Sequence, residues 1–397
     1  MPFFGSTLTL TTALLALILA GAYTAVLGPL FTVWGITNRE FSPVNNKKCT
    51  IEPLLPACEK IVQVQPSGIL YLACSKPSSR THWTPAVGRL NETGASFDDY
   101  VATYDPKSRV VTKLTVRGFS STRGLSLHGM DVVPSATDSD MLFVYLVNHR
   151  APLRNGKPVP AKDVGADSVI EIFKTTLGGR EMTHVKTVED DIIITPNDVI
   201  GEPDGASFYF TNDRDRKVGH GRELEVLGRG RTSVGFCHAN LGCHYAVQNM
   251  LGCNGIARAP NGTVYVADSI WGGISILERQ ADNTLVLTDK VATDRALDNL
   301  MVDSNGHVWA AGFPYMVSLL FKHFNYPDKE LSPSSAIRFS INTGKDAAYG
   351  KKYNVDKVFE DDGKIASGVT SAVYDADRKL LFMNGLASPH LAICKLK

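Results

Sequence analysis

Five oxygen-bearing side chains stand just before short apolar runs: Glu59, Asn197, Asn254, Asp298 and Asn299. Together they could bind calcium, which takes six to eight oxygen ligands from carboxylates, amide carbonyls and water. The two carboxylates would offset the charge of the ion, and an open position would remain for water or substrate. A single asparagine before a turn more often forms an Asx-turn. Five such residues at one position relative to the strands favour a calcium site.

Two histidines are candidates for proton transfer beside this site. His128 stands at the same position before another apolar run, and His149 closes the next strand-like run, 142–147. A neutral imidazole can act as a general base because its reference pKa lies near physiological pH. The alternative for each is a histidine that is only hydrogen-bonded in the core. We predict that His128 and His149 are the catalytic residues.

A repeated pattern of strands and turns explains how these residues could meet. Each of six segments has a polar residue, a short strand, a turn rich in Pro, Asp, Asn or Gly, and a second strand. The segments begin 44 to 72 residues apart, at Glu59, His128, Asn197, Asn254, Asp298 and Thr370. Propeller blades repeat about every 40–50 residues, and their innermost strands face a central channel. We predict an all-β fold, a six-bladed β-propeller over residues 39–397, with a β-sandwich as the alternative.

An apolar segment precedes the predicted propeller. Residues 1–38 contain no charged side chain, and 8–36 are predominantly apolar. About 20 such residues span the hydrocarbon core of a bilayer, so we expect an N-terminal hydrophobic helix that acts as a signal-anchor and contacts the membrane. A cleaved signal peptide is the first alternative, although the segment lacks a basic start and is long for one. A buried core helix is the second.

The cysteines indicate an oxidising compartment. Two of the seven, Cys49 and Cys394, lie at the two ends of the predicted propeller. Propeller rings often close by pairing an N-terminal strand with the last blade, and a bridge between these two cysteines would tie that closure. A local bridge between Cys237 and Cys243 remains open, and an odd count leaves at least one thiol unpaired. The spacing matches no standard zinc motif.

Two sequons, at Asn91 and Asn261, fit N-glycosylation in the same compartment. We therefore expect a secretory-pathway protein that is anchored on the lumenal or extracellular side, or secreted. Lys47 and Lys48 follow the apolar segment and by the positive-inside rule would favour a cytosolic body, but the cysteines and sequons outweigh them. The net charge of +1 comes from 41 basic and 40 acidic residues that are dispersed. This balance argues against a nucleic-acid partner.

An ordered set of short motifs resembles the paraoxonase/arylesterase family from Cys49 to the C-terminus. The motifs are Leu127-His128-Gly129-Met130, Leu146-Val147-Asn148-His149, Pro196-Asn197-Asp198-Val199, Asn254-Gly255-Ile256, Leu297-Asp298-Asn299-Leu300 and Ala392-Ile393-Cys394. The resemblance implies a six-bladed propeller with two channel calcium ions that hydrolyses lactones and aryl esters. It implies that the catalytic ion is bound by Glu59, Asn197, Asn254, Asp298 and Asn299. It also implies that His128 and His149 are the pair proposed to activate water. It also implies the disulfide Cys49–Cys394 and a retained N-terminal segment.

The chain departs from the family pattern at the second, structural calcium. The resemblance places that ion at the positions of Lys60, Asp198 and Met130, and the family has an aspartate where this chain has Lys60. We expect the Lys60 ammonium to pair with Asp198, so that one calcium binds rather than two. A second departure is Gly312-Phe313-Pro314 in place of Cys-His-Pro, which makes the wall of the pocket more apolar.

These observations predict a calcium-dependent hydrolase of lactones and aryl esters. No Gly-x-Ser-x-Gly motif is present in the sequence to suggest a serine hydrolase. One alternative is a related calcium propeller with gluconolactonase-like or strictosidine-synthase-like chemistry. Another is a non-catalytic, membrane-tethered propeller. We also expect the stretch from 212 to 252 to cover the entrance of the channel.

Overall fold

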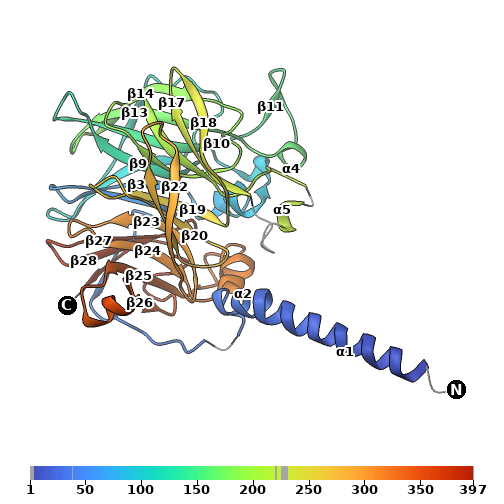
Figure 1. Cartoon of the computed structure of the whole chain (residues 1–397). Helices are drawn as coiled ribbons and strands as arrows, with labels where there is room; N and C mark the ends of the chain where they lie inside the picture. Colours follow the sequence, from blue (N-terminus) through green and yellow to red (C-terminus); the bar gives the residue numbers. More distant parts are fainter. Residues whose placement is uncertain (1–3, 38, 220, 225–230, 397) are drawn as a thin grey trace.

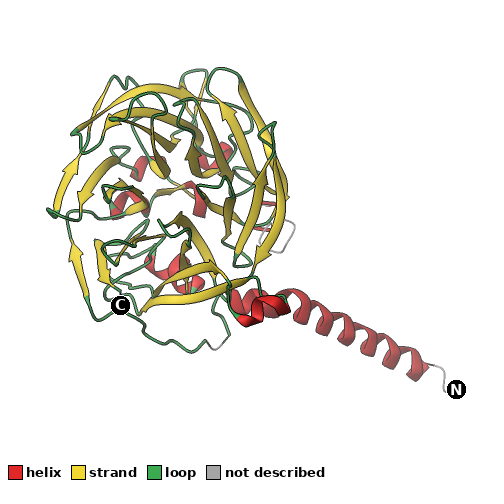
Figure 2. Cartoon of the chain, turned by 60° about the vertical axis from the view of Figure 1, so that its left-hand side comes forward, coloured by secondary structure: helices red, strands yellow, loops and turns green. Residues whose placement is uncertain are grey.

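Six antiparallel sheets stand around a central channel (Figures 1 and 2). The computed structural model describes residues 4–37, 39–219, 221–224 and 231–396. The first blade consists, from its inner strand outward, of β2 (Cys58–Val64), β3 (Ile69–Cys74), β6 (Tyr100–Asp105) and β7 (Val110–Lys113). The second consists of β9 (Leu127–Pro134), β10 (Met141–Arg150), β13 (Asp167–Thr176), β14 (Glu181–Val188) and β8 (Thr115–Arg117). The third consists of β15 (Pro196–Gly201), β16 (Ser207–Asn212), β17 (Thr232–His238) and β18 (Gly242–Met250). The short strand β8 pairs with β14 in parallel.

The other three blades have four strands each. The fourth consists of β19 (Cys253–Arg258), β20 (Val264–Asp268), β21 (Ile274–Arg279) and β22 (Leu285–Val291). The fifth consists of β23 (Ala296–Val302), β24 (Val308–Phe313), β25 (Ser334–Ile341) and β26 (Tyr353–Asp361). The sixth consists of β27 (Ser371–Asp375), β28 (Leu380–Asn384), β29 (Leu391–Lys395) and β1 (Cys49–Glu52). The prediction of a six-bladed propeller is therefore confirmed. Five predicted segments begin within the inner strands, and Thr370 immediately precedes β27.

The ring closes through the N-terminal strand. β1 is the outermost strand of the sixth blade and pairs with β29 in a register that places Cys49 opposite Cys394. A disulfide joins these two residues across 345 positions of sequence. Because the first and last strands share one sheet, the blades cannot separate without breaking both the hydrogen bonds and the disulfide.

Aromatic side chains fill the wedges between blades. The rings of Trp309 and Tyr374 stack at 4.4 Å between centroids, from the fifth to the sixth blade. Tyr104 meets Phe382 at 6.1 Å between the first and the sixth blade. Large rings suit this position because the blades diverge outward and leave a gap that only bulky side chains fill. Such pairs add about 0.5–1.5 kcal/mol to the stability gained from burial alone.

Bulges at the start of the inner strands turn polar residues toward the channel. In the third blade the pairing passes from Pro196 with Asn212 to Val199 with Phe210, so Asn197 and Asp198 lie in the shifted stretch. A β-bulge leaves its extra residue unpaired and changes where its side chain points. Four more inner strands have the same kind of shift near residues 59, 128–129, 254–255 and 298–299. The sixth inner strand, β27, pairs with β28 without one.

Glycines let neighbouring bulges pack directly against each other. A Cβ atom on Gly129 would lie 2.4 Å from the carbonyl oxygen of Asn197 and from the Cα of Asp198. A Cβ atom on Gly255 would lie 2.5 Å from the Cα of Asn299. Both distances are well inside van der Waals contact, so only glycine fits at these two positions.

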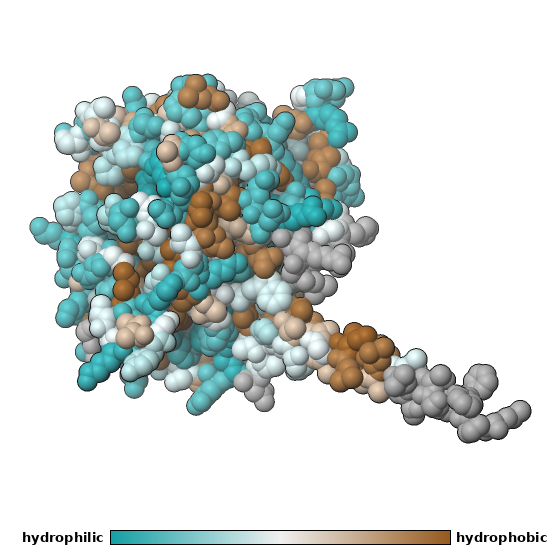
Figure 3. Space-filling view, viewed as in Figure 1, coloured by the Kyte–Doolittle hydropathy of each residue, from teal (hydrophilic) through white to brown (hydrophobic). Residues whose placement is uncertain are grey.

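An apolar helix leaves the propeller on one side (Figures 1 and 3). α1 (Phe4–Ala22) continues through a π-helical turn (Tyr23–Leu27) into α2 (Gly28–Val33). The stretch Thr11–Val33 is long and apolar enough to cross a membrane, so the predicted hydrophobic helix is present. Leu30 and Val33 are nevertheless buried against the propeller. The expected boundary at residue 38 lies outside the described residues.

The ring-closing disulfide should contribute much more stability than a local one. Replacing Cys49 and Cys394 by alanine removes a crosslink over 345 residues, and the chain-entropy model gives a loss of about 6 kcal/mol in unfolding free energy. The matched control replaces Cys237 and Cys243, which also form a disulfide and are 6 residues apart; here the same model gives about 2 kcal/mol. Urea unfolding of the two double variants measures both losses. Equal losses would show that the crosslink does not act by closing the ring.

Candidate active site

A cavity of about 140 Å³ lies at one end of the channel, with a polar floor and apolar walls. The floor is formed by side chains from the bulges and the loop after β16: His128, Asn197, Asp213, Asn254 and Asp298. The walls come from several separate segments: Trp34, Ala86, Val87, Ile270, Phe313, Met316, Leu319, Leu320, Phe324 and Leu386. The structure therefore brings four predicted site residues together around one cavity, and Phe313 forms part of the apolar wall as expected.

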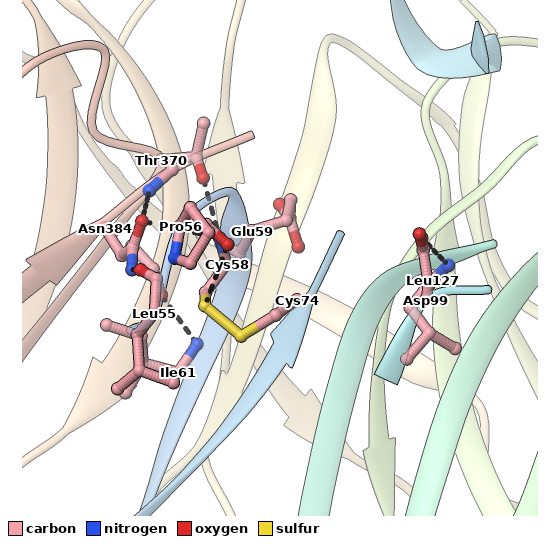
Figure 4. The surroundings of a disulfide bond; sticks show 12 residues. Leu55, Pro56, Cys58, Glu59, Ile61, Cys74, Asp99, Leu127, Thr370 and Asn384 are labelled. Carbon is pink, nitrogen blue, oxygen red and sulfur yellow. Dashed lines mark hydrogen bonds between the residues drawn. A yellow bond between two sulfur atoms is a disulfide. The ribbon is translucent and has the colours of Figure 1, made fainter. Parts of the chain in front are cut away.

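Glu59 is held in place by contacts on both sides of its backbone (Figure 4). A disulfide joins the preceding residue, Cys58, to Cys74 on β3. The hydroxyl of Thr370 donates to the carbonyl oxygen of Glu59 at 2.9 Å. The side chain is fully buried, and its Oε1 accepts a hydrogen bond from Asn299 at 2.6 Å. Glu59 therefore presents its carboxylate to the channel from a fixed backbone.

Several buried oxygens at this site receive no hydrogen bond from the described residues. They are Glu59 Oε2, Asn197 Oδ1, Asn254 Oδ1 and Asp213 Oδ1. A buried acceptor without a donor costs about 1–3 kcal/mol, and four around one channel are a large cost. The chemistry of these oxygens suits calcium, which prefers carboxylate and amide oxygens as ligands. The residues present thus fit a calcium ion.

Asn299 is oriented differently from the other predicted ligands. Its amide nitrogen donates to Glu59, while its oxygen lies 3.3 Å from the Lys60 ammonium. That oxygen therefore already has a cationic partner. The structure places Asn299 between Glu59 and Lys60, and its amide would have to turn before its oxygen could reach an ion beside Glu59.

Burial raises the pKa of three carboxyl groups at this site. Burial raises the pKa of Glu59, and it raises the pKa of Asp298 well above the ordinary value, with added repulsion from Glu59 and Asp198. Burial also raises the pKa of Asp213. Burial disfavours the ionised form of each carboxylate, and a bound divalent cation would favour it.

His128 faces the cavity, and His149 lies behind it. Their ring centroids are 5.3 Å apart in an edge-to-face arrangement. His128 Nε2 lies 3.3 Å from the amide nitrogen of Asn197 and 3.9 Å from Glu59 Oε1. His149 Nδ1 lies 2.8 Å from the hydroxyl of Ser168. Among the described residues, neither His128 Nδ1 nor His149 Nε2 has a hydrogen-bond partner.

Both imidazoles are neutral in this environment. Burial, with help from the positive charges of Arg80 and Lys60, lowers the pKa of His128 to about 3. Burial and the neighbouring His128 lower the pKa of His149 well below its ordinary value. A neutral ring can accept a proton, and the Glu59 carboxylate is close enough to stabilise the imidazolium that would form at His128.

A buried pair of charges fixes the backbone in front of His128. Asp99 accepts a hydrogen bond from the backbone amide of Leu127 at 2.8 Å (Figure 4). Arg80 donates to the carbonyl oxygen of Leu127 at 2.6 Å. The two side chains lie 3.5 Å apart, and both are buried. Together they bind the backbone carbonyl and amide groups of Leu127, the residue before His128. Sequence analysis did not identify this pair, because the two residues lie far from His128 in the chain.

At the base of the site, Lys60 forms the ion pair with Asp198 that the sequence led us to expect. The ammonium lies 2.5 Å from Asp198 Oδ2, and both side chains are buried. The third position of this group, Met130, is buried on β9.

The cysteines form three disulfides, Cys49–Cys394, Cys58–Cys74 and Cys237–Cys243, while Cys253 is free and buried. The pairing of Cys237 with Cys243 removes both as zinc ligands. Asn91 and Asn261 are exposed. Within the stretch from 212 to 252, residues 232–238 and 242–250 form the outer strands β17 and β18, whereas Asp213 and Arg214 line the cavity. That the stretch covers the channel entrance stays a prediction. The apolar lining includes Trp34 and four residues of the segment 316–324.

Comparison with known proteins assigns the chain to a protein family. The family model described as Arylesterase matches residues 91–396. The chain belongs to this family. Serum paraoxonase/arylesterase 2 of Gallus gallus is 24% identical over 351 residues, covering 85% of this chain and 86% of that protein. Serum paraoxonase/lactonase 3 of Homo sapiens is 22% identical over 366 residues, covering 90% and 93%.

The solved structure of a gluconolactonase from Xanthomonas campestris covers 90% of this chain and 99% of its own, with a TM-score of 0.44 and 14% identity. The resemblance to the paraoxonase/arylesterase family is confirmed by the match to the family model. The names of the relatives support hydrolase activity for this protein.

Proposed function

We propose that this protein is a calcium-dependent hydrolase of lactones and aryl esters. The observation that carries the proposal is the polar floor of an apolar-walled cavity, where His128 lies with the buried, undonated amide oxygens of Asn197 and Asn254. The buried Glu59 carboxylate lies 3.9 Å from His128. A structural ion alone would not need a proton acceptor beside it. The names arylesterase and lactonase of the relatives agree with this chemistry.

The calcium ion would be held by Glu59, Asn197, Asn254 and Asp298. Asn299 would keep its amide nitrogen on Glu59 and its oxygen on Lys60, and would position the Glu59 carboxylate. When bound, calcium supplies Lewis-acid stabilisation of the negative charge that develops on the carbonyl oxygen of an ester. The two carboxylates balance the charge of the ion, and the amides add neutral ligands. Asp213, which sequence analysis did not identify, lines the same floor and adds a further buried carboxylate.

The histidines would accept the proton of the attacking water and pass it to the leaving group. His128 accepts this proton as the water oxygen bonds to the carbonyl carbon, and the proton is then delivered to the alkoxide or phenoxide released when the ester bond breaks. The Glu59 carboxylate, whose Oε1 lies 3.9 Å from His128 Nε2, would stabilise the imidazolium between these two proton transfers. His149 does not line the same cavity, so it would position His128 or relay its proton.

The shape of the cavity suits an ester with an apolar substituent. The carbonyl end would enter the polar floor, and the substituent would lie among Trp34, Phe313 and the segment 316–324. The indole nitrogen of Trp34 donates to the carbonyl oxygen of Ile270 at 3.0 Å, which fixes the ring against the fourth blade. The residue after α2 therefore forms part of the proposed substrate pocket.

The proposed cellular setting follows from the helix and the disulfides. Three disulfides are typical of an oxidising compartment. We propose that α1 anchors the protein in a membrane, with the propeller on the lumenal or extracellular side and glycans on the exposed Asn91 and Asn261. Secretion after cleavage would remove Trp34 or its supporting helix, depending on the cleavage position.

Hydrolysis by the full-length protein in detergent tests the proposal. We expect turnover of lactones and phenyl acetate, loss of at least 90% of that turnover after chelation with EGTA (on the order of a tenfold fall or more, as expected when a metal stabilises the transition state), and recovery when calcium is added back. Magnesium is the matched control ion, because it demands a smaller octahedral site. Turnover that is insensitive to chelation would refute the calcium mechanism.

Replacing His128 by glutamine separates proton transfer from calcium binding. The variant His128→Gln should lower kcat for lactones by about 10²–10⁴-fold, the usual contribution of a general base, while its calcium affinity changes little. Calorimetry on the same preparations measures that affinity. His244→Gln is the control, since His244 is exposed on β18 and distant from the cavity walls. Unchanged turnover in His128→Gln would exclude this histidine as the base.

Replacing Trp34 by alanine tests the pocket wall. Trp34→Ala should lower kcat/KM for lactones with a long apolar chain by about 5–30-fold, because loss of one apolar contact surface costs roughly 1–2 kcal/mol, and should leave an unsubstituted lactone nearly unaffected. Trp271→Ala is the control, since Trp271 is also partly buried but does not line the cavity. An equal fall for both lactones would assign Trp34 a purely structural part.

A further inference from the structure

The Lys60 ammonium is surrounded like a bound ion. Its nitrogen lies 2.5 Å from Asp198 Oδ2, 3.3 Å from Asn299 Oδ1 and 3.5 Å from the carbonyl oxygen of Leu300. An ammonium has three hydrogen-bond donors, and here it meets three oxygens. The side chain is 5% exposed, and that of Asp198 is fully buried.

These contacts connect inner strands that are far apart in sequence. Lys60 extends from β2, Asp198 lies on β15, and Asn299 and Leu300 lie on β23. Asp198 Oδ2 also accepts a hydrogen bond from the amide of Ile256 on β19 at 2.9 Å. Four of the six inner strands therefore meet at one buried positive charge. A metal ion in a propeller channel would connect the strands in the same way.

The residues present do not fit a second calcium ion at this place. The family pattern has an aspartate where this chain has Lys60, so one of the expected carboxylates is replaced by a cation. A calcium ion beside Asp198 would be repelled by the ammonium at close range and would have to displace it. The remaining carboxylate, Asp198, already has its counter-ion.

We propose that Lys60 is a built-in cation that replaces the second, structural calcium. The chain then binds one calcium ion, and its ring stays folded when that ion is removed. Lys60 also lines a second cavity of about 220 Å³, which is bounded by residues farther along the inner strands than those of the candidate active site. The Lys60–Asp198 pair thus separates the proposed exchangeable calcium from the rest of the channel and ties the strands without metal.

The test measures metal content and stability, and it does not depend on esterase activity. The full-length protein in detergent is analysed by elemental mass spectrometry after equilibration with calcium, and its thermal midpoint is recorded with and without EGTA. We expect one calcium per chain and a folded protein after chelation. Two tightly held calcium ions, or unfolding of the wild-type chain by EGTA, would overturn the proposal.

Two variants make the test specific to Lys60. Lys60→Asp restores the second carboxylate, so we expect a second calcium and a thermal midpoint that falls by about 10 °C on chelation, as expected when a buried charge loses its partner. Lys60→Met keeps the length of the side chain without the charge, and we expect a lowered midpoint with no second ion. A Lys60→Met midpoint equal to that of the wild type would contradict a role for the ammonium.

The proposal and the proposed function can fail separately. A wild-type chain that binds no calcium, together with a destabilised Lys60→Met variant, would refute the calcium-dependent mechanism and still support Lys60 as the resident cation. If Lys60→Asp does not fold, the metal content of the wild type and the stability of Lys60→Met still decide the question.

Discussion

The burial of negative charge on the propeller axis is the constraint on which the rest of the structure depends. Glu59, Asp198, Asp213 and Asp298 are all buried near the channel. Isolated ionised carboxylates are costly in a protein interior, so each needs a cation, a proton or several donors. Lys60 provides one positive charge for Asp198. For Glu59 and Asp298, the proposed calcium ion would supply the positive charge.

The blades bring these buried carboxylates and amides together because five inner strands share the same β-bulge near their start. A bulge at the start of five inner strands points a polar side chain toward the axis, and glycines at 129 and 255 let adjacent bulges approach closely. The Cys58–Cys74 disulfide and the Arg80–Asp99 pair hold the backbone beside Glu59 and His128. The outer strands and interblade aromatic rings provide the rigid ring that makes such crowding possible.

The sequence predicted what the repeat determines and missed what long-range packing determines. The polar residues of the inner strands were found because each precedes the same strand and turn pattern, so one periodicity located them all. The Lys60–Asp198 pair followed from a single departure from the family pattern. Asp213 and the Arg80–Asp99 pair carry no such regularity, because they lie in connections between strands. Which loops cover a channel depends on how they fold back over it, and spacing along the chain does not record that.

The N-terminal helix shows why the division into anchor and propeller was too simple. Val33 of α2 is buried in a cluster that includes Phe313, Met316 and Leu319, and these three also line the cavity. A chain without α2 would expose that cluster to water and lose the support of Trp34. The apolar segment from α1 to α2 (Gly28–Val33) therefore leads directly to one residue of the cavity wall, Trp34, so the N-terminal element contributes to the packing of the pocket.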